Sequence, residues 1–260
     1  MTTWVIEHGI FDNELALIEE VRKQGHNVIE IDYVRNFDVN DMCYNVKYQS
    51  LLDQPVIFRG SLNVSSKVSR TTGWIPGTYC NRDNFKCSTY YTYWGKYLLN
   101  SNYIMMPASE LIRRWYDDRL FVRPDSGFKE FNGGTYTRDE FIKLNLNDET
   151  LVISSPVKQV DREYRFVVTG NTIVAGSQYL PTESITIEVA AIEYLQSILN
   201  KLRFKWHPDF IYTVDVCYAN DSYHVLELNS FSCSNLYQCD LAAVVECASQ
   251  LATDEWNEYQ

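Results

Sequence analysis

Residues 211–231, IYTVDVCYANDSYHVLELNSF, constrain the fold more than any other stretch of the chain. Two β-rich segments flank the turn-forming residues 219–222, which is the pattern of a β-hairpin. Side chains alternate between the two faces of a strand, so Glu227 and Asn229 point to one face. If the two strands pair about the turn, Asp215 lies opposite these side chains. The stretch therefore predicts a hairpin that carries two carboxylates and an amide on one face.

The other face of the same strand is expected to hold Leu226 and Leu228. Two carboxylates that converge on one face repel each other. Protonation relieves the repulsion, and so does a hard cation with oxygen ligands, for which Mg²⁺ is the usual choice beside phosphates. An exposed polar hairpin face is the alternative interpretation, and it needs no ligand. The hairpin alone leaves both interpretations open.

The composition is that of an ordinary soluble, globular protein. The 260 residues, 45% hydrophobic and 22% charged, suffice for one large domain or two smaller intertwined domains. No apolar run is long enough for a transmembrane helix, so no membrane partner is expected. The N-terminus has acidic residues and no basic segment, unlike a signal peptide. We therefore expect a cytoplasmic protein.

The net charge of −11 and the isoelectric point near 4.8 limit the possible partners. An acidic chain argues against a broad nucleic-acid-binding surface, which needs clustered Lys and Arg. A small anionic ligand that is held by a few local cations is still compatible with this charge.

The seven cysteines predict neither a zinc site nor a redox motif, because no two of them form a CxxC pair. They are Cys43, Cys80, Cys87, Cys217, Cys233, Cys239 and Cys247. Reduced thiols fit a cytoplasmic chain best. Cys233 follows the acidic cluster and is a candidate nucleophile, but a small buried residue is the better interpretation because no His is adjacent.

The chain opens with alternating strand and helix patterns. Residues 3–7 predict a strand, and residues 27–33 predict a second one. Between them we expect a helix that is capped by Asp12 and ends before Gly25. A β–α–β opening of this kind favours a parallel sheet. Residues 36–52 have no clear period, and we expect loop and a short helix there.

Residues 55–58 predict a third strand, which ends at a polar turn with Arg59 and Ser61. Ligands of open α/β sheets gather at the carboxyl ends of strands, so both residues are candidate substrate contacts. The alternative for Ser61 is the N-cap of a helix. The aromatic-rich residues 73–96 fit a segment that covers a cleft, where Arg82 meets either an anionic substrate or only solvent.

The second half of the chain, separated from the first near residue 100, begins with candidate phosphate-binding groups. Residues 119–124 predict a strand that presents Arg123 as a fixed fork donor. The loop of residues 125–137 contains three glycines, so its backbone N–H groups can line phosphates while Lys129 acts as a mobile charge. An ordinary glycine-containing turn gives the same pattern.

Two later strands carry further candidates. Residues 151–153 predict a strand, and the interruption at residues 154–157 has backbone groups suited to an adenine edge. The alternating residues 162–168 place Glu163 and Arg165 on one face. Arg165 is a candidate for holding a transferring phosphoryl group, and a cross-strand ion pair is the alternative.

Two long amphipathic helices follow these strands. The first is expected over residues 184–202, with Ser184 as its N-cap. The second, over residues 236–252, closes the chain after the hairpin. Cations, adenine-binding backbone and acidic residues therefore occur in a fixed order along the chain.

Several segments together resemble a known family. FVRPDSGFKEFNGG, REYRF and DV…HVLELNSFSCSNLY are similar to the ATP-grasp fold. More narrowly, they resemble a clade of small phage and bacterial ATP-grasp proteins, formerly a domain of unknown function, in which an Arg replaces the usual strand Lys. FRGS and WIPGTYCNRDNF resemble its N-terminal half. The resemblance implies an α/β (α+β) fold with an N-terminal open α/β subdomain, residues 1–100, and a nucleotide-binding domain of antiparallel sheets, residues 101–260.

The resemblance also implies roles for individual residues. Arg123 matches the phosphate-contacting cation, Lys129 the cation of the flexible loop, and Arg165 the Arg that stabilises the transferred phosphoryl group. The adenine hinge matches Ser154, Ser155, Pro156 and Val157, and the Mg²⁺ ligands match Asp215, Glu227 and Asn229. The chain departs from the family in its sparse glycine loop and in the further Lys expected near Lys96.

The activity implied by the resemblance is the ATP-dependent joining of a carboxylate to an amine through an acyl phosphate. Its cofactors are ATP and Mg²⁺, and its partners are small-molecule or peptide carboxylates and amines. A nucleotide-binding regulatory or partner-binding protein without turnover and a kinase-like phosphotransferase are the alternatives. The substrates and the oligomeric state do not follow from these patterns.

Overall fold

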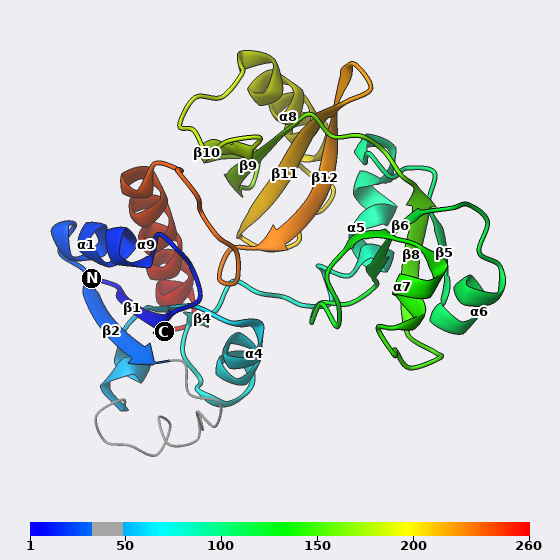
Figure 1. The fold of residues 1–260 in the computed structure, drawn as a ribbon. Coiled ribbons are helices and arrows are strands. Elements are labelled where there is room, and N and C mark those ends of the chain that lie inside the picture. The colour runs from blue at the N-terminus through cyan, green and yellow to red at the C-terminus, as the bar shows by residue number, and fades with distance from the viewer. Residues whose placement is uncertain (33–48) are drawn as a thin grey trace.

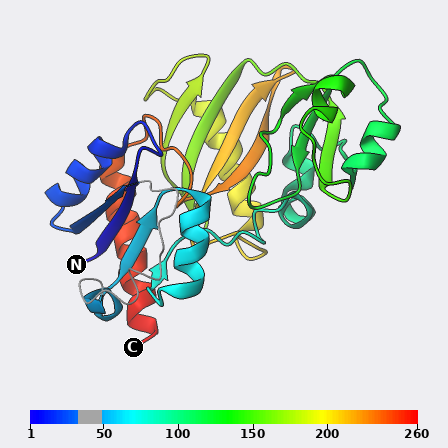
Figure 2. The same cartoon turned by 60° about the horizontal axis from the view of Figure 1, so that its bottom comes forward.

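The computed structural model describes residues 1–32 and 49–260, which form three four-stranded sheets (Figure 1). The sheets follow one another across the molecule, with the first at one end and the third at the other (Figure 2). Tyr33, Cys43 and most of the segment that was expected to be loop and short helix lie outside the described residues. None of the described helices has the length and apolar character needed to span a membrane.

The first sheet is parallel, with the strand order β2-β1-β3-β4. Its strands and helices are β1 (Thr3–His8), α1 (Glu14–Lys23), β2 (Asn27–Asp32), η1 (Ser50–Asp53), β3 (Val56–Arg59), α4 (Leu62–Thr71) and β4 (Pro76–Gly77). Parallel pairing of β1 with β2 across α1 confirms the predicted β–α–β opening. The N-cap of α1 is Asn13 instead of Asp12, and Gly25 follows the helix with a φ of 79°, as expected.

The second sheet is antiparallel, with the order β10-β9-β11-β12. Its strands are β9 (Arg162–Thr169), β10 (Thr172–Leu180), β11 (Ile211–Ala219) and β12 (Ser222–Ser230). The β11–β12 hairpin is confirmed, and it turns at Asn220 and Asp221, which have φ values of 50° and 59°. Apolar side chains of α5 (Cys87–Trp94) and α8 (Val189–Leu202) cover one face of the sheet.

A β-bulge distributes the side chains of β12 between the two faces. Asp215 pairs with Glu227, but the next pair along the ladder involves Val225, so Leu226 is an extra residue. Val225 therefore joins Leu228 in the core, whereas Glu227 faces the opposite side. The prediction that Leu226 lies behind the polar face is wrong, because Leu226 lines the same cavity as Glu227.

The third sheet is antiparallel, with the order β5-β8-β6-β7. Its elements are η2 (Gly95–Tyr97), β5 (Ile104–Pro107), α6 (Ala108–Arg113), β6 (Leu120–Pro124), β7 (Gly134–Tyr136), α7 (Arg138–Ile142) and β8 (Leu151–Pro156). The expected interruption after residue 153 is wrong, because Ser154 and Ser155 pair with Val122 and Phe121 of β6.

Both long helices begin later than expected. Helix α8 starts at Val189 and not at Ser184, because the backbone of Ser184 pairs with that of Gln178. The β-branched residues that follow Ser184 also favour extended backbone over helix. Helix α9 (Leu241–Glu258) starts where the Asp240 carboxylate accepts from the backbone N–H of Ala242 (2.9 Å), and not at residue 236.

Helix α9 returns the end of the chain to the first sheet, where it lies beside α1 (Figure 1). Apolar side chains of α9, α1 and β1 form one core with Phe231, which follows β12. The chain therefore passes through all three sheets before it comes back to the first. The domain boundary near residue 100 stays a prediction.

Arg59 connects the first sheet to the segment that follows β12. Its side chain is 1% exposed. The guanidinium donates to the carbonyl of Ser234 (2.7 Å) and to the carbonyl of Phe231, and it lies over the Phe231 ring. Arg59 therefore fixes the main chain just beyond Asn229.

We expect Arg59→Met to lower the free energy of unfolding by about 2–4 kcal/mol, because two buried carbonyls lose their donor. Chemical denaturation followed by tryptophan fluorescence measures this change. Arg70→Met is the matched control, since Arg70 is exposed and donates to Ser66 of its own helix; a change below about 0.5 kcal/mol is expected. An Arg59→Met protein of unchanged stability would favour the predicted substrate contact instead.

Candidate functional site

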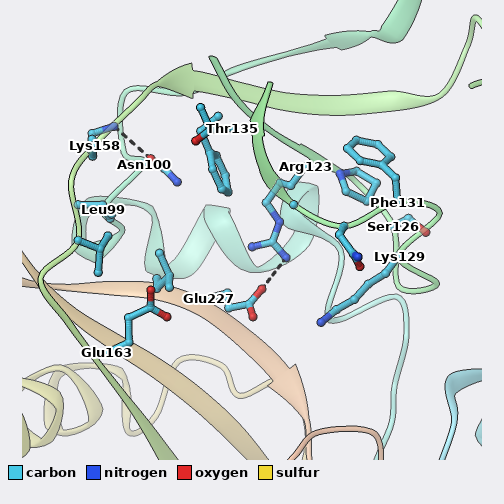
Figure 3. Close-up of a pocket in the computed structure, with 16 residues that line it drawn as sticks. Leu99, Asn100, Arg123, Ser126, Lys129, Phe131, Thr135, Lys158, Glu163 and Glu227 are labelled. Atoms are coloured by element: carbon cyan, nitrogen blue, oxygen red, sulfur yellow. Dashed lines mark hydrogen bonds and ion pairs between the residues drawn. The ribbon is translucent and has the colours of Figure 1, made fainter. Parts of the chain in front are cut away.

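A cavity of about 450 Å³ lies between the second and third sheets (Figure 3). Strand β6 and the loop after it supply Arg123 and Lys129 to its wall. Strands β9 and β12 supply Glu163 and Glu227 from the opposite side. Cations and acids on different sheets therefore face the same space.

A buried ion pair lies beneath this wall. Arg165 and Asp215 are neighbours in the register of β9 and β11, and they are 7% and 1% exposed. The guanidinium donates from Nε to Oδ1 (2.7 Å) and from Nη2 to Oδ2 (2.6 Å), while Nη1 donates to the carbonyl of Asn235 (2.9 Å). Burial acts to lower the pKa of Arg165, but Asp215 outweighs burial and raises it. The bidentate contact thus fixes the position of the Asp215 carboxylate.

Asn229 joins the buried pair to the cavity wall. Its Nδ2 donates to Oδ2 of Asp215 (3.3 Å) and to Oε1 of Glu227 (2.9 Å). Its Oδ1 accepts from Lys129 Nζ (2.9 Å), and Oε2 of Glu227 pairs with Arg123 Nη2 (3.0 Å). The three predicted cations and the three predicted oxygen-bearing residues therefore form one connected network.

Two groups of this network are prepared for an ionic ligand. Burial acts to raise the pKa of Glu227, but Lys129 and Arg123 outweigh it and hold the pKa well below its usual range. Glu227 is therefore an ionised oxygen donor at neutral pH. The Nε of Arg123 is buried and has no hydrogen-bond partner among the described residues. A buried donor of this kind beside a cavity is a candidate contact for an anion.

The loop of residues 125–133 carries Lys129 into the site. A Cβ at Gly127 would lie 2.6 Å from the carbonyl oxygen of Arg82, so only glycine allows the two segments to come this close. Lys129 has a φ of 52°, which non-glycine residues seldom adopt. Its side chain extends toward Glu227 (Figure 3). The close approach at Gly127 and the left-handed backbone at Lys129 together hold the loop in this position.

Two cavity residues, Lys158 and Asn100, were not predicted. Lys158 Nζ donates to Oδ1 of Asn100 (3.1 Å) and of Asn102 (3.0 Å), and burial lowers its pKa. Neither residue has a periodic pattern around it that would have revealed its role. The further Lys was expected near Lys96, which is exposed and lies over the Tyr97 ring (4.9 Å).

Glu163 also lines the cavity and was not named as a site residue. Burial raises its pKa. A sequence signal for it existed, because strand alternation places Glu163 on the same face as Arg165.

The predicted adenine hinge lies at the end of β8. Ser154 and Ser155 are buried in the sheet, and Ser155 Oγ donates to Oδ1 of Asn100 (2.9 Å). Among the described residues, Lys158 and Val160 line the cavity here, and residues 154–157 do not. Contact of Ser154, Ser155, Pro156 and Val157 with adenine stays a prediction.

The three substrate candidates lie in different places. Arg82 lines a second cavity of about 30 Å³ together with Lys129 and Asn229, and its guanidinium lies over the Phe128 ring (4.1 Å). Ser61 is the N-cap of α4, with its Oγ accepting from the backbone N–H of Val64 (3.4 Å), so the capping alternative is confirmed. The guanidinium of Arg59 is used by the main-chain carbonyls described above. The structure brings Arg82 to the network, whereas substrate contacts of Arg59 and Ser61 stay predictions.

The side chains of the network suit a magnesium triphosphate. The described residues contain no cluster of three or more His, Cys, Asp or Glu side chains that could hold a metal ion. The predicted ligand set instead has two carboxylates and an amide, and such oxygen donors suit Mg²⁺. Each carboxylate is already paired with an Arg. The residues fit a ligand that brings a cation for the carboxylates and anionic oxygens for the Arg and Lys side chains.

The fold is similar to those of solved ATP-grasp proteins. A RimK domain ATP-grasp protein from Sphaerobacter thermophilus is 10% identical, with a TM-score of 0.59 over 99% of this chain and 98% of its own. D-alanine–D-alanine ligase from Bacillus anthracis is 13% identical, with a TM-score of 0.53 over 99% and 96%. The ATP-grasp ligase PsnB, in complex with a minimal precursor, Mg and ADP, is 13% identical, with a TM-score of 0.59 over 97% and 98%. Identities this low show a shared fold.

The family assignment comes from the sequence. No curated protein matches the chain significantly. A family model of the ATP-grasp domain, the one for family 3 of its clade, matches residues 63–247, a range that includes the whole network from Arg123 to Asn229. The chain therefore belongs to this clade family of ATP-grasp domains.

Proposed function

We propose that this protein is an ATP-dependent ligase that joins a carboxylate to an amine. The observation that carries the proposal is the network of three cations and three oxygen-bearing residues beside a cavity of about 450 Å³. Membership of the ATP-grasp family supports it. Two neighbours are named as ligases, and the PsnB structures contain a precursor peptide, which supports peptides as candidate substrates.

The ion pairs explain how an acidic protein accommodates a triphosphate. Arg123 and Lys129 contact Glu227 and Asn229 directly. Magnesium offers those oxygen atoms another partner, and phosphate oxygens offer the cations one. When metal and triphosphate bind together, no partly buried charge is left without a partner, which avoids a large desolvation cost.

In the proposed reaction, Mg-ATP supplies the phosphoryl group that activates the substrate carboxylate as an acyl phosphate, and the amine then displaces phosphate. Arg123 and Lys129 neutralise charge on the transferring group. Glu227, Asp215 and Asn229 orient the metal. Arg165 is proposed to stabilise the transferred group from behind Asp215, whose carboxylate it holds. Loop 125–133 and Lys158 limit the access of water to the cavity.

Turnover of Mg-ATP over a panel of amino acids and peptides tests the function. We expect release of ADP and phosphate that depends on one carboxylate and one amine, with an amide product in mass spectrometry. A phosphorylated product would indicate a phosphotransferase. Nucleotide binding without turnover would indicate a regulatory protein, and the absence of both binding and turnover would reject the site.

We expect Glu227→Gln to weaken Mg-ATP binding by roughly ten-fold, which is about 1.4 kcal/mol. The reason is that the amide retains the shape of the side chain but loses the charge that faces the metal. Calorimetry with and without Mg²⁺ measures it, and the gain from Mg²⁺ should shrink in the variant. Glu193→Gln on the exposed face of α8 is the matched control. An undiminished Mg²⁺ effect would remove Glu227 from the metal site.

We expect Arg165→Lys to lower turnover by about 100-fold while Mg-ATP affinity changes little. Lysine keeps the positive charge beside Asp215 but lacks the planar fork that spans both carboxylate oxygens. Single-turnover kinetics and calorimetry separate the two quantities, with the exposed Arg203→Lys as control. A shift in the Mg²⁺ dependence of binding with normal turnover would instead show that Arg165 only positions Asp215.

A further inference from the structure

Two further cavities continue from the site toward the first sheet. The cavity of about 30 Å³ shares Arg123 and Lys129 with the large cavity. It also shares Cys80 and Arg82 with a third cavity of about 380 Å³, which lies between β4 and the segment of residues 209–210. The three cavities therefore adjoin one another in series, starting from the proposed nucleotide site.

The third cavity is lined by acids that have no cationic partner. Asp209 and Glu255 contribute to its wall, and neither forms an ion pair with any described residue. Asp209 accepts from the backbone N–H groups of Asn81 (3.2 Å) and Phe210 (2.9 Å). Burial raises the pKa of Asp209 to about 7 and also raises the pKa of Glu255. Acids this far removed from water normally have a counter-charge.

A tyrosine hydroxyl adds a second, independent feature. Tyr79 is 1% exposed and lines the same cavity, where its hydroxyl faces Glu255. Neither this hydroxyl nor Oε1 of Glu255 has a hydrogen-bond partner of normal geometry within the described part of the chain. Buried polar atoms without partners cost free energy, so the cavity suits a ligand that donates several hydrogen bonds.

We propose that the third cavity binds a positively charged group, an alkylammonium or a guanidinium, of the amine substrate. The inference rests on the proposed ligase function and specifies one of its two substrates. Either group brings N–H donors and the missing counter-charge to Asp209, Glu255 and Tyr79. The substrate class is an amine with a second cationic centre about one side-chain length from the reacting nitrogen.

The charges along the series support this direction of binding. Arg82 lies at the junction of the second and third cavities, where it is close to Lys129 and the proposed phosphate end. Beyond this junction the unpaired charges are negative. Asp83 also lines the third cavity, but it pairs with Lys86 (2.6 Å) and needs no further cation. An anionic substrate group would therefore be attracted to the junction and repelled beyond it.

Calorimetry with 1,5-diaminopentane, without nucleotide, tests the proposal on the full chain. We expect saturable binding that weakens at least ten-fold in Asp209→Asn and in Glu255→Gln and is retained in Asp209→Glu. Glu258→Gln, at the exposed end of the same helix as Glu255, is the matched control and should bind normally. The neutral analogue 1,5-pentanediol should not bind. Thermal unfolding establishes that each variant is folded, and Glu255→Gln decides the test if Asp209→Asn is not.

The proposal is overturned if the diamine does not bind, or if it binds the two neutralised variants as tightly as the parent protein. Mg-ATP affinity should be the same in all variants, because these residues lie outside the nucleotide cavity. A protein that binds the diamine through Asp209 but never turns over ATP would refute the ligase function and leave the cation site. Turnover with singly charged amines at equal KM in all variants would refute the cation site and leave the ligase.

Discussion

The bidentate contact between Arg165 and Asp215 is the interaction on which the rest of the site depends. It joins β9 and β11 in the middle of the central sheet and uses both carboxylate oxygens. Asn229 is held by Asp215, and Asn229 in turn contacts Glu227 and Lys129. The position of one buried pair is thus passed on to the cavity wall by a short series of hydrogen bonds. Partial burial strengthens every contact in that series relative to water.

The arrangement of three sheets separates the charges before it pairs them. The acids of the network stand on the second sheet, whereas Arg123 and Lys129 come from the third sheet and its loop. Contacts between the two groups therefore cross the boundary of a cavity and remain accessible to a ligand that carries both signs of charge. Arg59 adds a rigid connection from the first sheet to the segment after β12, so the hairpin is anchored at both ends. The acidic third cavity lies on that same side of the molecule.

Much of the site was predictable from local patterns. The turn residues around Asn220 and the β-rich segments beside them specify the hairpin, and strand alternation is enough to set Asp215 opposite Glu227. Alternation likewise places Arg165 and Glu163 on one face. The order of motifs then favours an ATP-grasp domain, which the family match bears out. Periodicity also identified both long helices, although their first residues were wrong.

The sequence by itself determined the elements and the chemical character of the site, and the tertiary structure decided which groups meet. The bulge that turns Leu226 toward the cavity depends on the pairing of β11 with β12, not on the residues of β12 alone. The burial of Arg59 and the contact of Lys158 with Asn100 join segments that no local pattern relates. Tyr79 and Glu255 face each other only because α9 returns to the first sheet. Periodicity reports on neighbours within a turn or a strand, whereas these contacts depend on how distant segments pack together.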